Sequence, residues 1–147
     1  MQSRISGLAV VIAAVVHFGL GTAWFTLFAK PWMAGLGMTP EQLQAARQNI
    51  TPLPYFAALI CSLVMACAIA WILSTTANPG VLKGLLTGIA VGIIVAAAML
   101  TEYGFERRPY MFALIAAGYP FVGSMLMGTI IGAFRRRDKA EGLKAAA

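Results

Sequence analysis

Charged residues in this chain are confined to short stretches that separate four long uncharged tracts, at residues 5–29, 48–82, 84–101 and 109–134. A helix needs about 20 consecutive, mostly apolar residues to cross the hydrocarbon core of a bilayer. Strands with open edges are excluded at that depth, because lipid offers their backbone groups no hydrogen-bond partners. The pattern therefore predicts four transmembrane helices, near residues 6–28, 53–74, 82–103 and 110–134.

The composition places the chain outside the soluble classes. Of its 147 residues, 60% are apolar and 11% are charged, whereas soluble domains are about 45–50% apolar and about 25% charged. Disorder would need low hydrophobicity and high charge, and two cysteines are too few for a disulfide scaffold. We therefore expect an all-α, polytopic membrane protein, with one four-helix bundle over residues 1–134 and a basic tail at residues 135–147.

The distribution of lysine and arginine predicts the orientation of the four helices. Both termini and the second loop share one side, which carries seven cations: Arg4, Lys83, Arg135, Arg136, Arg137, Lys139 and Lys144. The other side carries four cations: Lys30, Arg47, Arg107 and Arg108. Because cytoplasmic segments are the richer in these residues, both termini are predicted to be cytoplasmic. The basic tail is interpreted as this topology signal and as a lipid-headgroup contact, so no nucleic-acid partner is expected.

The first outer loop contains the signature of a helix start. In the run Thr39-Pro40-Glu41-Gln42, Thr39 is the expected N-cap and Gln42 the third residue of a capping box. From Leu43 onward, the apolar residues of this segment fall on one helical face. We expect a short amphipathic helix that lies on the outer membrane surface.

Small residues recur every fourth position on the third and fourth predicted helices. They are Gly84, Gly88 and Gly92 on the third, and Ser124, Gly128 and Gly132 on the fourth. Fourfold spacing places such residues on one stripe, where the missing side chains allow another helix backbone to come close. Packing of the third helix on the fourth is the favoured interpretation, and contact between two chains in a homodimer is the alternative.

His17 is the first candidate for a functional residue, because it falls close to the middle of the first predicted helix. Ionisable residues at that depth are rare and are candidates for a functional site. Tyr119 reaches a similar depth on the fourth predicted helix, so the two side chains could share a hydrogen bond. Two interpretations stay open: a polar pair that joins two helices, or the floor of a binding site.

Aromatic residues gather at the predicted outer end of the bundle. Trp24 lies two turns above His17 on the same face, and Glu102 should reach nearly the depth of Trp24. A pocket mouth at this end would consist of Trp24, Trp32, Tyr103 and Glu102. The alternative is an interfacial anchor, in which Glu106 pairs with an arginine and Glu102 reaches the surrounding water.

A series of short motifs runs along the chain in a distinctive order. They are Trp24-Phe25, Leu27-Phe28, Pro31-Trp32-Met33, Gly84, Gly88, Phe105-Glu106, Pro109, Gly118-Tyr119 and Met127-Gly128. Together they resemble a small bacterial membrane family, domain-of-unknown-function family number seventeen sixty-one, over nearly the whole chain up to Phe134. The resemblance implies a four-helix membrane protein without an established activity, in the bacterial inner membrane. That family often carries Trp-Tyr at Trp24-Phe25 and an asparagine at Ala116, so this chain lacks two of its polar groups.

Two functions stay open from the sequence. The favoured one is a non-enzymatic interaction or accessory subunit, whose glycine-lined helix faces bind a second copy or another membrane-protein partner. The alternative is a carrier or binder of a small molecule, with the aromatic mouth and Glu102 at one end and His17 at mid-membrane. We expect no catalysis, no cofactor and no metal, because the spans hold few polar groups. The lipid bilayer is a partner in both cases.

Overall fold

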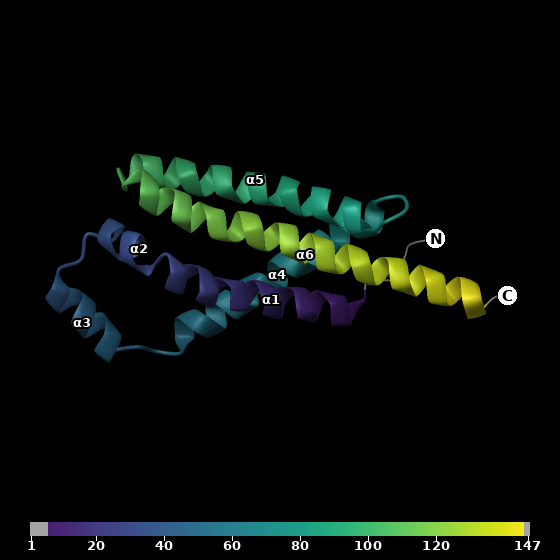
Figure 1. Cartoon of the computed structure of the whole chain (residues 1–147), viewed down its shortest axis with the longest axis horizontal. Helices are drawn as coiled ribbons and strands as arrows, with labels where there is room; N and C mark the ends of the chain where they lie inside the picture. The colour runs from purple at the N-terminus through teal and green to yellow at the C-terminus, as the bar shows by residue number, and fades with distance from the viewer. Residues whose placement is uncertain (1–5, 146–147) are drawn as a thin grey trace.

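The computed structural model describes residues 6–145, without the side chains of Arg47 and of residues 135–145. This part of the chain is all-α (Figure 1). Its helices are α1 (Gly7–Leu27), α2 (Ala29–Gly35), α3 (Pro40–Gln48), α4 (Leu53–Thr75), α5 (Val81–Phe105) and α6 (Tyr110–Ala145). The turn between α5 and α6 lies at the same end of the bundle as α2 and α3, and we call this the α2 end (Figure 1).

Four of these helices are long and apolar enough to cross a membrane: α1, α4, α5 and the part of α6 from Tyr110 to Phe134. They cover the four apolar tracts of the sequence, as expected of a multi-pass membrane protein. One boundary differs from the expectation, because α6 continues past Phe134 to Ala145 and the basic segment extends the fourth helix. The cationic side chains of that segment, and Arg4, lie outside the described residues.

The glycines of α5 pack directly against α6, so the predicted packing of the third span on the fourth is confirmed. A Cβ atom at Gly84 would collide with the carbonyl oxygen of Gly128, and one at Gly92 would lie 2.6 Å from Ser124 Oγ. Ser124 Oγ also donates a hydrogen bond to the Gly88 carbonyl oxygen, at 2.9 Å. Figure 1 shows the resulting antiparallel hairpin.

The same packing determines what the glycine stripes contact within the chain. The glycine-lined faces of α5 and α6 cover each other within one chain, and a Cβ atom at Gly132 would likewise lie 2.5 Å from the Gly80 carbonyl oxygen. A partner subunit cannot reach a face that the neighbouring backbone already occupies. The stripes are thus occupied within one chain, and the binding of a second copy or an accessory partner stays a prediction.

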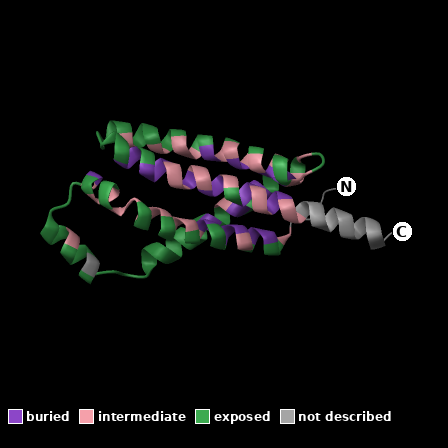
Figure 2. Cartoon of the chain, viewed as in Figure 1, coloured by how far each residue is buried: buried purple, intermediate pink, exposed green. Residues whose placement is uncertain are grey.

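The other two long helices form the second half of the bundle. Helix α1 packs against α6 and α4, and α4 passes behind α1 in the view of Figure 1. Small residues make the close α1–α4 contact, with Ala13 and Ala14 of α1 buried together with Ala66 and Ala70 of α4. Toward the α2 end, residues 51–61 are all exposed (Figure 2), so α4 separates from α1 there.

The capping box predicted for the first loop is present at the start of α3. The Thr39 hydroxyl accepts a hydrogen bond from the Gln42 amide at 3.3 Å, and the Thr39 amide donates to Gln42 Oε1 at 2.9 Å. These two bonds satisfy backbone groups that have no partner within the helix. The location of α3 on the membrane surface stays a prediction.

Candidate functional site

The structure brings His17 and Tyr119 together in the middle of the bundle and adds Ser62 to them. His17 is 5% exposed. Its Nδ1 atom lies 2.8 Å from Ser62 Oγ on α4 and 3.1 Å from the Tyr119 hydroxyl on α6. The two rings are stacked at a tilt, with centroids 4.6 Å apart. Three helices are thus joined by one polar cluster at the depth where the sequence placed His17.

The hydrogen-bond pattern assigns the protons of this cluster. The Ser62 hydroxyl donates to the Ala58 carbonyl oxygen at 2.8 Å, and the Tyr119 hydroxyl donates to the His17 carbonyl oxygen at 3.2 Å. With both hydroxyl protons in use, His17 Nδ1 is left as the donor to Ser62 Oγ. We assign a neutral imidazole with its lone pair at Nε2, because a second ring proton there would be a buried N–H group without a partner among residues 6–145.

Nε2 of His17 is buried and has no hydrogen-bond partner within residues 6–145. The imidazole edge that carries it packs on Gly123 of α6, where a Cβ atom would lie 2.6 Å from Nε2. Gly123 therefore provides the space that the imidazole occupies. A lone pair without a partner costs less than an N–H group without one, which agrees with the proton assignment.

Ser62 and Gly123 were not recognised from the sequence, although one signal was present. The hydroxyl of a serine in a spanning helix usually donates a hydrogen bond to a carbonyl oxygen one turn earlier, so a serine alone does not indicate a site. Its position was the signal: Ser62 lies in the middle of the second uncharged tract, at the depth of His17. No signal singled out Gly123 among 15 glycines.

A cavity of about 540 Å³ lies at the α2 end, where α1 and α4 separate. Its wall is largely aromatic, and the aromatic members are Phe18, Phe25, Trp32, Tyr55 and Tyr119. Small residues and two threonines complete the wall, among them Gly21, Thr22, Thr26 and Ala58. Pockets for small molecules commonly measure about 300–1,000 Å³ and are lined mainly by apolar and aromatic side chains.

Tyr119 connects this cavity to the buried histidine. Its ring belongs to the cavity wall, and its hydroxyl belongs to the His17 cluster. Gly21 of α1 permits this arrangement, because a Cβ atom there would lie 3.0 Å from the Tyr119 hydroxyl. A molecule in the cavity would therefore contact the side chain that holds His17.

Three of the four predicted mouth residues lie elsewhere. The Trp24 indole N–H donates to the Ile115 carbonyl oxygen at 2.9 Å, which fastens α1 to α6. Tyr103 packs edge-on against Phe112, with centroids 5.3 Å apart. Glu102 is exposed on α5, a helix that makes no contact with α1 within the described residues. Of the predicted mouth, Trp32 alone is part of the cavity wall.

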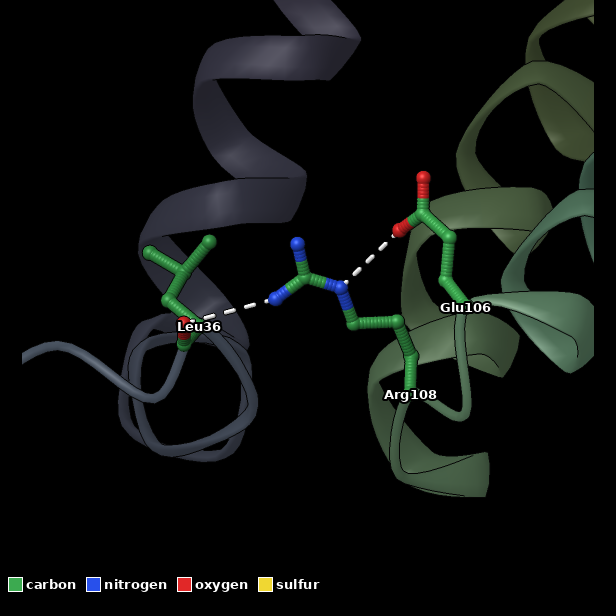
Figure 3. A network of polar contacts seen from close by, with 3 residues as sticks. All are labelled: Leu36, Glu106 and Arg108. Carbon is green, nitrogen blue, oxygen red and sulfur yellow. Dashed lines mark hydrogen bonds and ion pairs between the residues drawn. The ribbon is translucent and has the colours of Figure 1, made fainter.

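A polar network ties the α5–α6 turn to the end of α2 (Figure 3). Arg108 Nε lies 3.0 Å from Glu106 Oε2, so the predicted ion pair between Glu106 and an arginine is confirmed. Arg108 Nη1 donates to the Leu36 carbonyl oxygen at 3.4 Å, and its guanidinium lies 5.5 Å from the centre of the Phe112 ring. The network helps to hold α2, and hence Trp32, against α6.

Aromatic contacts continue from this network down to the polar cluster. Phe112 stacks on Trp32 with centroids 6.2 Å apart, and Trp32 contacts Phe25 edge-on at 5.2 Å. Phe25 in turn lies 5.5 Å from Tyr119, which contacts His17. The column fixes one wall of the cavity through side chains of α1, α2 and α6.

The fold and the site define a class: a multi-pass membrane protein with four spans, a polar cluster at its centre and an aromatic cavity at one end. Within that class, the chain belongs to the family described as "Protein of unknown function (DUF1761)", whose model matches residues 8–132. The resemblance stated from the motifs is thereby confirmed. No curated protein matches the chain, and no solved structure matches it.

Proposed function

We propose that this protein binds a small, mainly apolar molecule in the cavity between α1, α2, α4 and Tyr119, without changing it chemically. The observation that carries the proposal is the cavity itself: about 540 Å³ of aromatic-lined space at a point where two spanning helices separate. A packed bundle gains from close contact along its helices. An occupant would restore the contacts that α1 and α4 lack there.

The composition of the wall supports binding more than catalysis. Apart from the tyrosine hydroxyls, the wall of the cavity has no acidic or basic side chain. General acid–base chemistry needs a group that exchanges protons near neutral pH within reach of the substrate. His17 is separated from the cavity by Tyr119, so it supports that ring and does not face the ligand.

The proposal includes an orientation. Seven of the 11 lysines and arginines lie on the side of the two termini and the second loop. This bias favours a cytoplasmic location of both ends and puts the α2 end on the opposite face of a bacterial inner membrane. The cavity then opens toward the outer half of the bilayer.

Tryptophan fluorescence in lipid discs tests the proposal, with a neutral brominated naphthalene as the apolar probe. Bromine quenches tryptophan on contact, so a probe in the cavity quenches Trp32 with a saturable dependence on concentration. Trp71 is 65% exposed on α4 and reports the unsaturable background from probe dissolved in lipid.

Ala58→Phe fills the cavity from α4 and should weaken the saturable quenching by about tenfold or more, equivalent to roughly 1.4 kcal/mol. Ala57→Phe is the matched control, because Ala57 is exposed on the same helix but lies outside the cavity wall. Equal saturable quenching in both variants, or none in the wild type, would show that the cavity binds nothing.

A further inference from the structure

One threonine in the cavity wall differs from all others in the four long helices. The hydroxyl groups of the others donate to a carbonyl oxygen in the preceding turn: Thr26, Thr75, Thr87, Thr101 and Thr129. Thr22 makes no such bond within the described residues, and its side chain is exposed in the cavity wall. A spanning helix rarely leaves a hydroxyl unpaired, because lipid offers no replacement for the lost bond.

Two further donors in the same wall are unpaired. The indole N–H of Trp32 and the hydroxyl of Tyr55 have no partner among the side chains and backbone atoms that the structure describes. Trp24 provides the comparison, since its indole N–H is bonded to Ile115. The cavity therefore offers several hydrogen-bond donors, from α1, α2 and α4, and no charged side chain.

We propose that the ligand is a neutral, planar, lipid-soluble molecule with carbonyl oxygens, of the chemical class of the isoprenoid quinones. This inference rests on the function proposed above. The carbonyl oxygens would accept hydrogen bonds from Thr22, Trp32 and Tyr55, while the ring packs against the aromatic wall.

The chemistry of the wall selects this class over two others. A charged amphiphile would have to lose its hydration without an opposite charge in the wall to replace it. A pure hydrocarbon would fit the aromatic surface but would leave the donors unpaired. The cavity is open where Thr22, Tyr55 and Ala58 are exposed, so an isoprenoid tail can leave it between α1 and α4 into the lipid.

Native mass spectrometry from lipid discs tests the ligand class with two probes that share a tail. One is para-benzoquinone with a decyl chain, and the other is decylbenzene, which has the ring and tail but no carbonyl. We expect the wild-type protein to retain the quinone more tightly than decylbenzene. Thr22→Val keeps the side-chain shape and removes the hydroxyl, so it should weaken quinone binding by about fivefold.

Thr101→Val is the matched control, because Thr101 lies on α5 outside the cavity wall and its hydroxyl already donates to the Ala97 carbonyl oxygen. This variant should retain the quinone like the wild type, and both variants should retain decylbenzene equally. Equal affinity for the two probes, or equal effects of the two substitutions, overturns the ligand class and leaves the cavity as a general apolar site. If the brominated naphthalene also shows no saturable quenching, the proposed function itself has failed.

Discussion

Substitution of Gly123 by alanine should disrupt the polar cluster at the centre of the bundle. The new Cβ atom would lie 2.6 Å from His17 Nε2 and closer still to the neighbouring ring carbon, whereas non-bonded atoms prefer about 3.5–4.0 Å. The imidazole must therefore move away from α6 by about 1.5 Å. The contact is with a ring held by Ser62 and Tyr119, so the displacement is not absorbed by a flexible chain end.

The size of the effect follows from three contributions. Overpacking a buried site costs about 1–3 kcal/mol, and loss of the 2.8 Å bond from His17 to Ser62 costs about 1 kcal/mol. Replacement of a helical glycine by alanine stabilises the helix by about 0.8–1.0 kcal/mol, which offsets part of this cost. We therefore expect Gly123→Ala to lower the free energy of unfolding by about 1–3 kcal/mol.

A double-mutant cycle with His17→Ala isolates this contact. Removal of the imidazole leaves the Ser62 and Tyr119 hydroxyls bonded to backbone carbonyls, so His17→Ala creates no unpaired hydroxyl. In that background the alanine at position 123 has free space, and its cost should fall to about zero. Reversible unfolding in mixed detergent micelles gives the four free energies, and Gly19→Ala, where a Cβ meets nothing within 4 Å, is the control. If Gly123→Ala costs the same with and without the imidazole, the assigned contact between His17 and Gly123 is refuted.

Two further predictions concern the α5–α6 hairpin and Glu102, a predicted mouth residue that lies outside the cavity wall. Gly88→Leu should prevent α5 from packing on α6, because a Cβ atom at Gly88 already collides with the α6 backbone. We expect this variant to lose its folded peak in size-exclusion chromatography. Gly104→Leu is the control and should elute like the wild type, because Gly104 has open space around it. A normal elution profile for Gly88→Leu would contradict the packing. Glu102→Gln should leave saturable probe quenching unchanged, since Glu102 lies outside the cavity wall, and a reduced affinity would return Glu102 to the site.

The helices and the hairpin could be predicted because their causes are local in the sequence. Uncharged tracts of about 20 residues indicate spanning helices. Fourfold glycine spacing indicates a close helix contact, and the short connection between α5 and α6 makes these two helices neighbours. The capping box at Thr39 depends on residues three apart and was equally visible. Each of these features is determined by residues that lie close together in the sequence.

The mouth residues could not be predicted, because depth in the membrane does not determine direction around a helix. Glu102 and Trp24 were placed at similar depth, but α5 packs on the side of α6 away from α1, so the two residues do not share a site. The hydrogen bond of Trp24 to Ile115 likewise depends on the rotation of α1 against α6. His17 and Tyr119 were paired successfully because α1 and α6 are in direct contact at that depth.

The cavity begins where the close packing of α4 on α1 ends. Away from the α2 end, Ala66 and Ala70 are fully buried, and this small surface lets α4 come close to α1. Toward the α2 end, Ala58 continues the fourfold spacing of Ser62, Ala66 and Ala70, but it is exposed and lines the cavity together with Tyr55. Close contact therefore ends at the level of Ser62, and the helices diverge beyond it.

Helix α1 cannot follow α4 outward, because α6 holds it at two glycines. Its indole at Trp24 packs on Gly118, where a Cβ atom would lie 3.0 Å from the ring, and His17 packs on Gly123. One wall of the cavity is thus fixed by α6, while the other is a half-helix of α4 with no buried residue from Leu53 to Cys61. An occupant of the cavity would therefore contact a wall fixed by α6 on one side and the exposed half of α4 on the other.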